Sequence, residues 1–302
     1  MRVRNALLFV ALAVAWGSAF TAIKAGLEYF PPVLFAAFRY DLASLLVLAY
    51  AAYATDRWRP RSRDEWLVVA IGGSLLIAAY HAFLFVGERG TTSAAAAIVV
   101  SLSPVLSTGF ARAFLPDERL TPLGIVGLLV GFVGVVVLTG PESDALLDTR
   151  TISLGLVFLA TASFALGSVL TRRIDDELPV ETMEAWSMIV GAVLLHALSL
   201  ALSESVSGVR WTNEGVLALA YLALVASAAG FLIYFDLLDR LGPIQINLVS
   251  YAAPVFAAIT GWLLLDETIT SSTVAGFGIV LLGFLLLKRD AIRAELAGIG
   301  LR

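Results

Sequence analysis

The chain has 302 residues, of which 59% are hydrophobic and 15% are charged, and its formal net charge is −4. Soluble domains average about 45–50% apolar and about 25% charged residues, so this chain carries more apolar surface than a soluble fold hides from water. The composition also excludes a disordered chain and a basic nucleic-acid binder. Because there is no cysteine, it excludes a disulfide framework and thiolate metal sites. A polytopic helical membrane protein remains.

Ten apolar stretches follow one another along the chain. A membrane helix needs about 20 mostly apolar residues, whereas a barrel strand needs about 10 alternating ones, so helices are predicted. Short breaks that contain proline or glycine separate the stretches and leave little room for a soluble catalytic domain. The predicted spans are 5–27, 32–54, 66–86, 91–114, 121–139, 152–172, 180–203, 213–237, 243–265 and 270–288.

The basic residues predict that both termini are cytoplasmic, because loops rich in lysine and arginine stay on the cytoplasmic side. With the N-terminus inside, fifteen of the 20 basic residues fall in inside segments and one, Arg39, lies within a span. The four in outside segments are Lys24, Arg89, Arg150 and Arg210. The first apolar run continues without a break through Ile23, so we expect an uncleaved span rather than a signal peptide.

The two halves of the chain resemble each other. The matching positions, at an offset of 149 or 150 residues, are Gly17 with Gly167, Ser18 with Ser168, Pro104 with Pro254, Gly127 with Gly276 and Gly134 with Gly283. Each half holds five predicted spans, an odd number, so the second half enters the membrane from the opposite side. This is an inverted repeat, a recurrent plan of secondary transporters. The repeats are predicted over residues 1–140 and 151–290.

These features resemble the drug/metabolite transporter superfamily, in particular its ten-span EamA-type permeases. The segment from Trp16 to Phe20 resembles the family's opening motif, and Arg39 its usual arginine in the second span. Pro104 and Pro254, each followed by an acidic corner and a glycine-rich helix, resemble the ends of its two repeats. The resemblance covers residues 5–288. It implies transport of amino acids, metabolites, toxic compounds or sugar-linked nucleotides through a central cavity lined by spans 1, 3, 4, 6, 8 and 9.

Two charged residues lie within the second predicted span. A charge at the bilayer centre costs about 2.5–3.5 kcal/mol by insertion scales, so Arg39 and Asp41 both need an explanation. Residues two apart point to different sides of a helix, and each therefore needs its own partner. Arg39 either clamps an anionic group or acts as a gate, or it staples two helices together. Asp41 is either a proton-coupling carboxylate or a structural partner of a nearby helix.

A polar stripe in the ninth predicted span consists of Asn247, Ser250, Tyr251 and Pro254, at the spacing of one helix face. We expect it to face a cavity; the alternative is helix–helix hydrogen bonding. The other predicted cavity residues offer hydroxyl groups and aromatic faces to a small zwitterionic or aromatic solute. They are Trp16, Ser18, Thr21, Tyr80, His81, Ser101 and Tyr234. Pro104 and Pro254 are predicted to act as hinges of gating helices.

Motifs for other activities are missing from the sequence. Neither histidine has a second ligand at i+4, so no metal site is expected, and there is no phosphate-binding or hydrolase motif. No cofactor and no nucleic-acid partner are expected. The Gly127-x-x-x-Gly131 motif serves either a homodimer or packing within the monomer. Glu181 and Glu184 are expected at the cytoplasmic interface.

The sequence therefore predicts a multi-pass transporter in the plasma or inner membrane, with a small solute and the lipid bilayer as its partners. We expect an exporter of a small organic solute, such as an amino acid or another metabolite. It would work by alternating access around a midplane cavity. A channel or a structural membrane protein is the alternative, and an intramembrane enzyme is a further one. The apolar spans offer no clear nucleophile–base pair for an enzyme.

Overall fold

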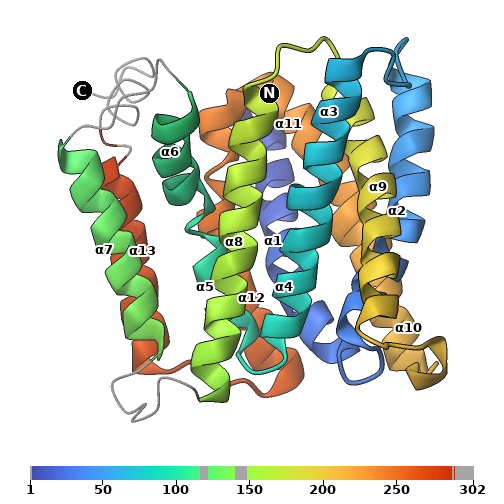
Figure 1. Ribbon diagram of the computed structural model, residues 1–302. Coiled ribbons are helices and arrows are strands. Elements are labelled where there is room, and N and C mark those ends of the chain that lie inside the picture. Colours follow the sequence, from blue (N-terminus) through green and yellow to red (C-terminus); the bar gives the residue numbers. More distant parts are fainter. Residues whose placement is uncertain (1, 116–121, 140–147, 288, 290–302) are drawn as a thin grey trace.

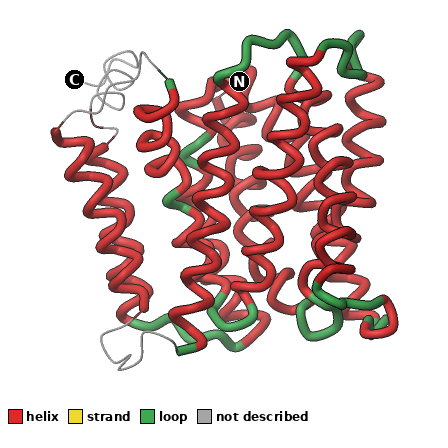
Figure 2. The backbone as a smooth tube through the Cα atoms, viewed as in Figure 1, coloured by secondary structure: helices red, strands yellow, loops and turns green. Residues whose placement is uncertain are grey.

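The structure, a computed structural model, describes residues 2–115, 122–139, 148–287 and 289. Within these residues every regular element is a helix and no strand is present (Figures 1 and 2). The expectation of an all-helical chain is thus confirmed. The predicted repeat ends at residues 140 and 290 lie outside the described residues.

Seven helical segments of the described chain are long and apolar enough to cross a membrane. They are Val3–Gly26, Pro32–Ala54, Arg63–Glu88, Ser93–Phe114, Thr149–Arg172, Val180–Ala201 and Asn213–Gly242. Three shorter apolar helices fall on the other three predicted stretches. They are Pro122–Leu138, Val249–Leu265 and Ser271–Leu287.

The helices of the first half begin at residues suited to helix starts. Proline suits the first turn of α2 because its φ is fixed and it lacks the backbone N–H that would have no partner there. A capping box between Ser62 and Glu65 starts α3. The elements are α1 (Arg2–Gly26), α2 (Pro32–Ala54), α3 (Arg63–Ile71), the π-helix η1 (Gly72–Ala79), α4 (Tyr80–Glu88), α5 (Ser93–Val100), α6 (Ser103–Phe114) and α7 (Pro122–Thr139).

The second half follows the same order. Its elements are α8 (Thr149–Arg172), α9 (Val180–Ala201), the 3₁₀ turn η2 (Val206–Gly208), α10 (Asn213–Ala220), the π-helix η3 (Tyr221–Ala229), α11 (Gly230–Ile246), α12 (Val249–Leu265) and α13 (Ser271–Leu287). Asp148 and Thr212 cap α8 and α10 with their side-chain oxygens. Within α11, Gly242 has a φ of 77° and interrupts the helix, a conformation that glycine adopts without the steric cost of a Cβ.

The two π-helices occupy equivalent places in the two halves, since η1 begins at residue 72 and η3 at residue 221, and 221 − 72 is the repeat offset of 149. Each lies in the middle of a long rod, between α3 and α4 in one half and between α10 and α11 in the other. π-Helical turns are rare and are frequently found at functional sites. Their equivalent placement in the two halves makes the interior beside these two helical segments a candidate location for a functional site.

The packing of α7 against α13 has the geometry of an inverted repeat. A Cβ on Gly127 would lie 2.6 Å from the carbonyl oxygen of Gly283, and one on Gly134 would lie 2.9 Å from that of Gly276. The two helices are therefore antiparallel. Gly127 contacts Gly283, the repeat equivalent of Gly134, and Gly134 contacts Gly276, the repeat equivalent of Gly127. Figure 1 shows the pair at one edge of the bundle. The glycine face of α7 thus packs within the chain.

The remaining helices of the two halves interleave. α1 packs against α12, α2 against α9 and η3, and α8 against α4 and α6. The N-terminus and the α2–α3 and α8–α9 loops lie at one end of the bundle (Figure 1), which we call the N-terminal face. The α1–α2, α4–α5 and α12–α13 loops lie at the opposite face.

The two predicted hinge prolines have different surroundings. The fourth predicted span is divided, because α5 ends at Val100 and α6 begins at Ser103 with Pro104 in its first turn. Proline tolerates this position, where its missing N–H has no intrahelical partner. In contrast, α12 continues through Pro254. The hinge roles of Pro104 and Pro254 stay a prediction.

Candidate functional site

Arg39 of α2 lies at the centre of the candidate site. It is 6% exposed, and its Nε donates a hydrogen bond of 2.9 Å to Ser227 Oγ of η3. The two terminal nitrogens of the guanidinium make no hydrogen bond to the described residues, yet they are not among the polar atoms sealed from solvent. Arg39 is therefore anchored at one atom and presents two terminal nitrogens, with four N–H donors, in a fixed fork.

His81 of α4 is held by two hydrogen bonds. Its Nδ1 lies 2.9 Å from the carbonyl oxygen of Ile77, which can only accept, so Nδ1 carries a proton. Its Nε2 lies 2.7 Å from the Tyr40 hydroxyl, which can donate or accept. Both ring nitrogens are thus used within the protein. Tyr80 packs edge-on against His81, with ring centroids 4.5 Å apart.

An aromatic group from α1 and α11 lies across the interior. The Trp16 indole donates a 3.1 Å hydrogen bond to the Ala226 carbonyl in η3, and its ring lies 5.5 Å from that of Tyr234. A Cβ on Gly230 would lie 2.8 Å from the indole nitrogen, so this glycine makes the close approach possible. The π-helix η3 therefore supplies contacts to both Trp16 and Arg39.

The other predicted hydroxyl residues are used in bonds between or within helices. Ser18 lies 2.5 Å from the Tyr221 hydroxyl, and Thr21 lies 2.6 Å from the Thr260 hydroxyl. Ser101 donates to the Ile98 carbonyl three residues earlier. These three residues hold helices in place in this conformation, and their role in a solute site stays a prediction.

The predicted polar stripe of the ninth span is divided by the structure. Asn247 is exposed in the turn before α12, because the helix begins only at Val249. Tyr251 is buried, its ring centroid lies 4.1 Å from that of Phe284, and its hydroxyl has no partner among the described residues. Ser250 is partly buried. The four residues thus do not form one face of a helix.

Asp41 lies away from Arg39, as their spacing predicts. Its carboxylate is 2.8 Å from His196 Nε2 of α9, and both side chains are roughly two-fifths exposed, at 43% and 38%. This pair joins α2 to α9 at their partly exposed contact. The structure thus supplies a partner on a nearby helix for Asp41, as the structural alternative requires. The role of Asp41 in proton coupling stays a prediction.

Glu184 is a candidate that the sequence reasoning missed. It was expected at the cytoplasmic interface, but it is only 7% exposed, one turn into α9. Its carboxylate makes no hydrogen bond to the described residues and is not sealed from solvent. Tyr40 lies within electrostatic range of both Glu184 and Arg39. Ser187, Met188 and Gly191, which share the helix face of Glu184, are also buried, so Glu184 lies on the inward face of α9. The sequence alone does not show that α2 packs against this face.

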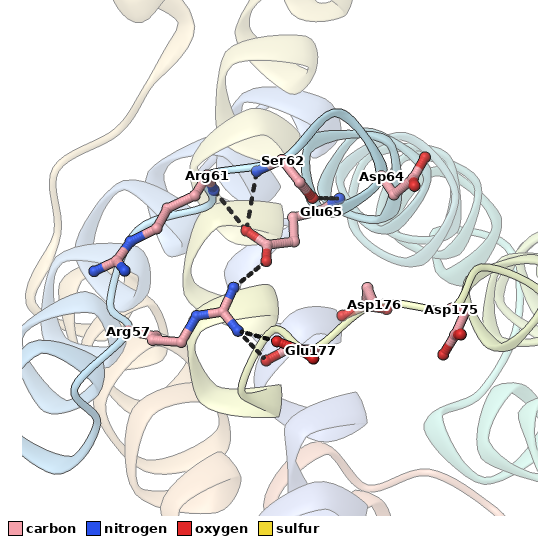
Figure 3. A pocket seen from close by; sticks show the side chains of 8 residues that line it. All are labelled: Arg57, Arg61, Ser62, Asp64, Glu65, Asp175, Asp176 and Glu177. Atoms are coloured by element: carbon pink, nitrogen blue, oxygen red, sulfur yellow. Dashed lines mark hydrogen bonds and ion pairs between the residues drawn. The ribbon is translucent and has the colours of Figure 1, made fainter.

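A hollow of about 460 Å³ lies at the N-terminal face, between the α2–α3 loop and the α8–α9 loop (Figure 3). Arg57 contacts both Glu65 and Glu177 there. The Trp186 indole also donates a 2.9 Å bond to the Trp58 carbonyl. These contacts join the two halves at this face, and the charged lining is that of a surface hollow rather than a solute site at the midplane.

The opposite face is joined by two charged side chains. The Lys24 ammonium of α1 donates to the carbonyl oxygens of Glu88, Arg89 and Thr91 at 2.9, 3.0 and 2.9 Å. The Glu267 carboxylate, just after α12, accepts 3.0 Å bonds from the Ser93 N–H at the start of α5. Positive charge at the end of one helix and negative charge at the start of another are both favourable for the helix dipoles.

Helices with apolar outer surfaces, an inverted pair of glycine-packed helices and a buried arginine define a polytopic membrane protein of the transporter type. The profile of the EamA-like transporter family matches residues 4–140 and 151–289. The chain belongs to the EamA-like transporter family.

Several curated proteins are similar over nearly the whole chain. An inner membrane transporter of Escherichia coli strain K12, YedA, is 30% identical over 91% of this chain and 88% of its own. A transporter of Archaeoglobus fulgidus is 28% identical over 91% of this chain and 95% of its own. A WAT1-related chloroplastic protein of Arabidopsis thaliana is 27% identical over 90% of this chain and 66% of its own. This similarity supports a membrane transporter.

A solved crystal structure shares the fold. It superposes with a TM-score of 0.68 over 98% of this chain and 100% of that chain, at 23% sequence identity. At this level of identity the likeness concerns the fold alone.

Proposed function

We propose that this protein is a secondary transporter that exports a small organic solute carrying an anionic group, such as an amino acid. In this proposal ten helices cross the membrane, in repeats of residues 1–140 and 151–290, and the N-terminal face is cytoplasmic. The distribution of charge supports this orientation. Among the described residues, eleven basic residues lie toward the N-terminal face and four toward the opposite face. The eleven are Arg2, Arg4, Arg57, Arg59, Arg61, Arg63, Arg112, Arg172, Arg173, Arg240 and Arg289, and the four are Lys24, Arg89, Arg150 and Arg210.

The observation that carries the proposal is the anchoring of Arg39. A buried guanidinium is costly in a membrane unless it is paired. Its one hydrogen bond to the described residues is from Nε, and its carbon lies 5.3 Å from the centre of the Tyr40 ring. The two remaining nitrogens suit the two oxygens of a carboxylate or phosphate, because Arg binds such groups bidentately. A bound anionic solute would therefore complete the hydrogen bonding of Arg39.

The surroundings of Arg39 favour a zwitterion over a simple anion. Glu184 offers a buried carboxylate from the other repeat, and a carboxylate can accept hydrogen bonds from an amine. Trp16, Tyr80 and Tyr234 add aromatic surface, which suits the apolar part of a solute or its cationic end. One arginine and one glutamate then bind the two ends of the same solute.

The mechanism in this proposal is alternating access between the two faces. Contacts across the repeats are present at both faces, between Arg57 and Glu177 at the N-terminal face and between Ser93 and Glu267 at the opposite face. Each set must break in turn for the solute to pass. The divided helix α5–α6 and the interrupted α11 provide points where the backbone can bend.

The test is exchange of radiolabelled amino acids by proteoliposomes. Arg39→Lys keeps the charge but loses the planar fork, so we expect at least about a tenfold loss of exchange, the equivalent of one charge-assisted hydrogen bond. Arg63→Lys, an exposed arginine at the start of α3, is the matched control and should exchange normally. Equal exchange in both variants would remove Arg39 from the site. A flux that does not saturate would indicate a channel instead.

A further inference from the structure

Glu88, the last residue of α4, is a buried acidic residue that the proposed solute site does not use. It is 0% exposed, and neither of its carboxylate oxygens has a hydrogen-bond partner among the described residues. The hydroxyl of Thr91, three residues later and 6% exposed, is likewise buried without a partner. Such atoms are rare in folded proteins, and each needs an explanation.

None of the charged groups nearest Glu88 forms a hydrogen bond with its carboxylate. Lys24 of α1 has three N–H donors, and all three go to backbone carbonyls, including that of Glu88 itself. Glu267 accepts from Ser93 and adds a second negative charge nearby. Arg39 of α2 donates from its Nε to Ser227 and makes no hydrogen bond to Glu88.

The other elements around α4 do not supply a partner either. α5 and η1 carry no charged side chain. Near the start of α8, the guanidinium of Arg150 donates to the Leu138 carbonyl. On α4 itself, both ring nitrogens of His81 are bonded to Tyr40 and Ile77, and Tyr80 is the remaining titratable group. An ionised carboxylate at Glu88 would thus be a buried charge without a donor, which is strongly unfavourable.

We propose that Glu88 is a proton-binding site, and that its protonated form stabilises closure of the opposite face. The two unpartnered groups lie in the same short segment that Lys24 and Glu267 hold from two other elements. Opening this face requires Lys24 to release the three carbonyls. Water then reaches the carboxyl group, which transfers its proton to water, and the freed ammonium can pair with the resulting carboxylate.

The same cycle runs in reverse when the face closes. The Glu88 carboxylate takes a proton from water, Lys24 returns to the carbonyls, and the neutral carboxyl group is buried. Under the proposed orientation this proton comes from outside the cell, so acid outside favours the closed face. The gating role rests on the proposed transport function, whereas the protonation of Glu88 does not.

The first test is infrared spectroscopy of the purified protein in lipid nanodiscs at neutral pH. We expect a C=O stretching band of a protonated carboxylic acid that disappears in Glu88→Gln, a neutral variant of nearly the same shape. Glu267→Gln is the matched control and should keep that band, because its carboxylate accepts hydrogen bonds from Ser93. An unchanged band in Glu88→Gln would overturn the proposal. If that variant does not fold, Glu88→Asp should shift the band, and an unshifted band would be equally decisive.

The second test measures opening through a single cysteine, Thr91→Cys, in a chain that has no cysteine of its own. Labelling by a maleimide should rise with pH by up to about tenfold per pH unit beyond the change due to thiol ionisation. In Glu88→Gln this additional rise should vanish. The same pH dependence in both backgrounds would refute the gating role while leaving the solute-exchange result for Arg39 untouched.

Discussion

The α7–α13 contact allows a stability prediction with a clear magnitude. A Cβ added at Gly127 would lie 2.6 Å from the Gly283 carbonyl oxygen and 2.8 Å from the Leu287 nitrogen. Real Cβ atoms essentially never come within 3.0 Å of such atoms, so Gly127→Ala must move the backbones apart by at least 0.4 Å (3.0 − 2.6). Overpacking of this kind typically costs about 1–3 kcal/mol.

Gly278→Ala is the matched control, because it lies on α13 and a Cβ there meets nothing within 4 Å. Alanine in a helix interior is about 0.5–1 kcal/mol more favourable than glycine. Both glycines lie inside helices, so this gain is common to the two variants and cancels in their comparison. The two variants should therefore differ in their free energy of unfolding by the overpacking cost alone, about 1–3 kcal/mol. Unfolding in mixed micelles of increasing SDS content, followed by far-UV circular dichroism, measures this difference. Equal midpoints would refute the antiparallel glycine contact.

Three further predictions concern single contacts. Glu204 accepts hydrogen bonds from the Val33 and Leu34 N–H groups at the start of α2. Glu204→Ala should therefore increase amide hydrogen exchange in the first turn of α2. Unchanged exchange there would contradict the capping role of Glu204. His196→Phe should lower the Tm in detergent because it leaves Asp41 without its partner. Asp41→Asn should lower the Tm by a similar amount. The double variant should lose no more than either single variant, and additive losses in Tm would contradict the coupling. The hydrogen bond from Thr151 lowers the pKa of Asp148; its stabilisation is thus present above the ordinary aspartate pKa and lost as pH falls through the lowered one. The Tm difference between wild type and Asp148→Ala should therefore shrink in acid, and a constant difference would contradict this.

The sequence predicts the helices and their order well, because both depend on local apolar length. The matched glycines at an offset of 149 residues also anticipate the α7–α13 pair, since close packing of helices in membranes requires small residues. The family assignment follows from the same repeated features. Helix lengths and the positions of small residues can thus be read from one amino-acid sequence.

The site is less predictable because its residues depend on which helices become neighbours. Arg39 is a candidate from its charge and from its resemblance to the family's usual arginine, yet Ser227, its partner, lies 188 residues away. Glu184 was misplaced because an acidic residue in a first helical turn usually faces water. Asn247 was assigned to a helix because nothing in its sequence marks the late start of α12. The π-helices have no simple residue signature, so their contacts with Trp16 and Arg39 could not be anticipated.

The chain has two lysines, Lys24 and Lys288. Because there are so few, the acylation of Lys24 can be followed as a measure of whether its contacts are formed. An acylating reagent needs a free, unprotonated amine, and an ammonium held by three carbonyls offers none. Lys24 should therefore resist acylation while its face is closed and react once it opens. If this face lies outside the cell, as in the proposed orientation, an impermeant reagent outside intact cells records through Lys24 how often the face is open, without any engineered label.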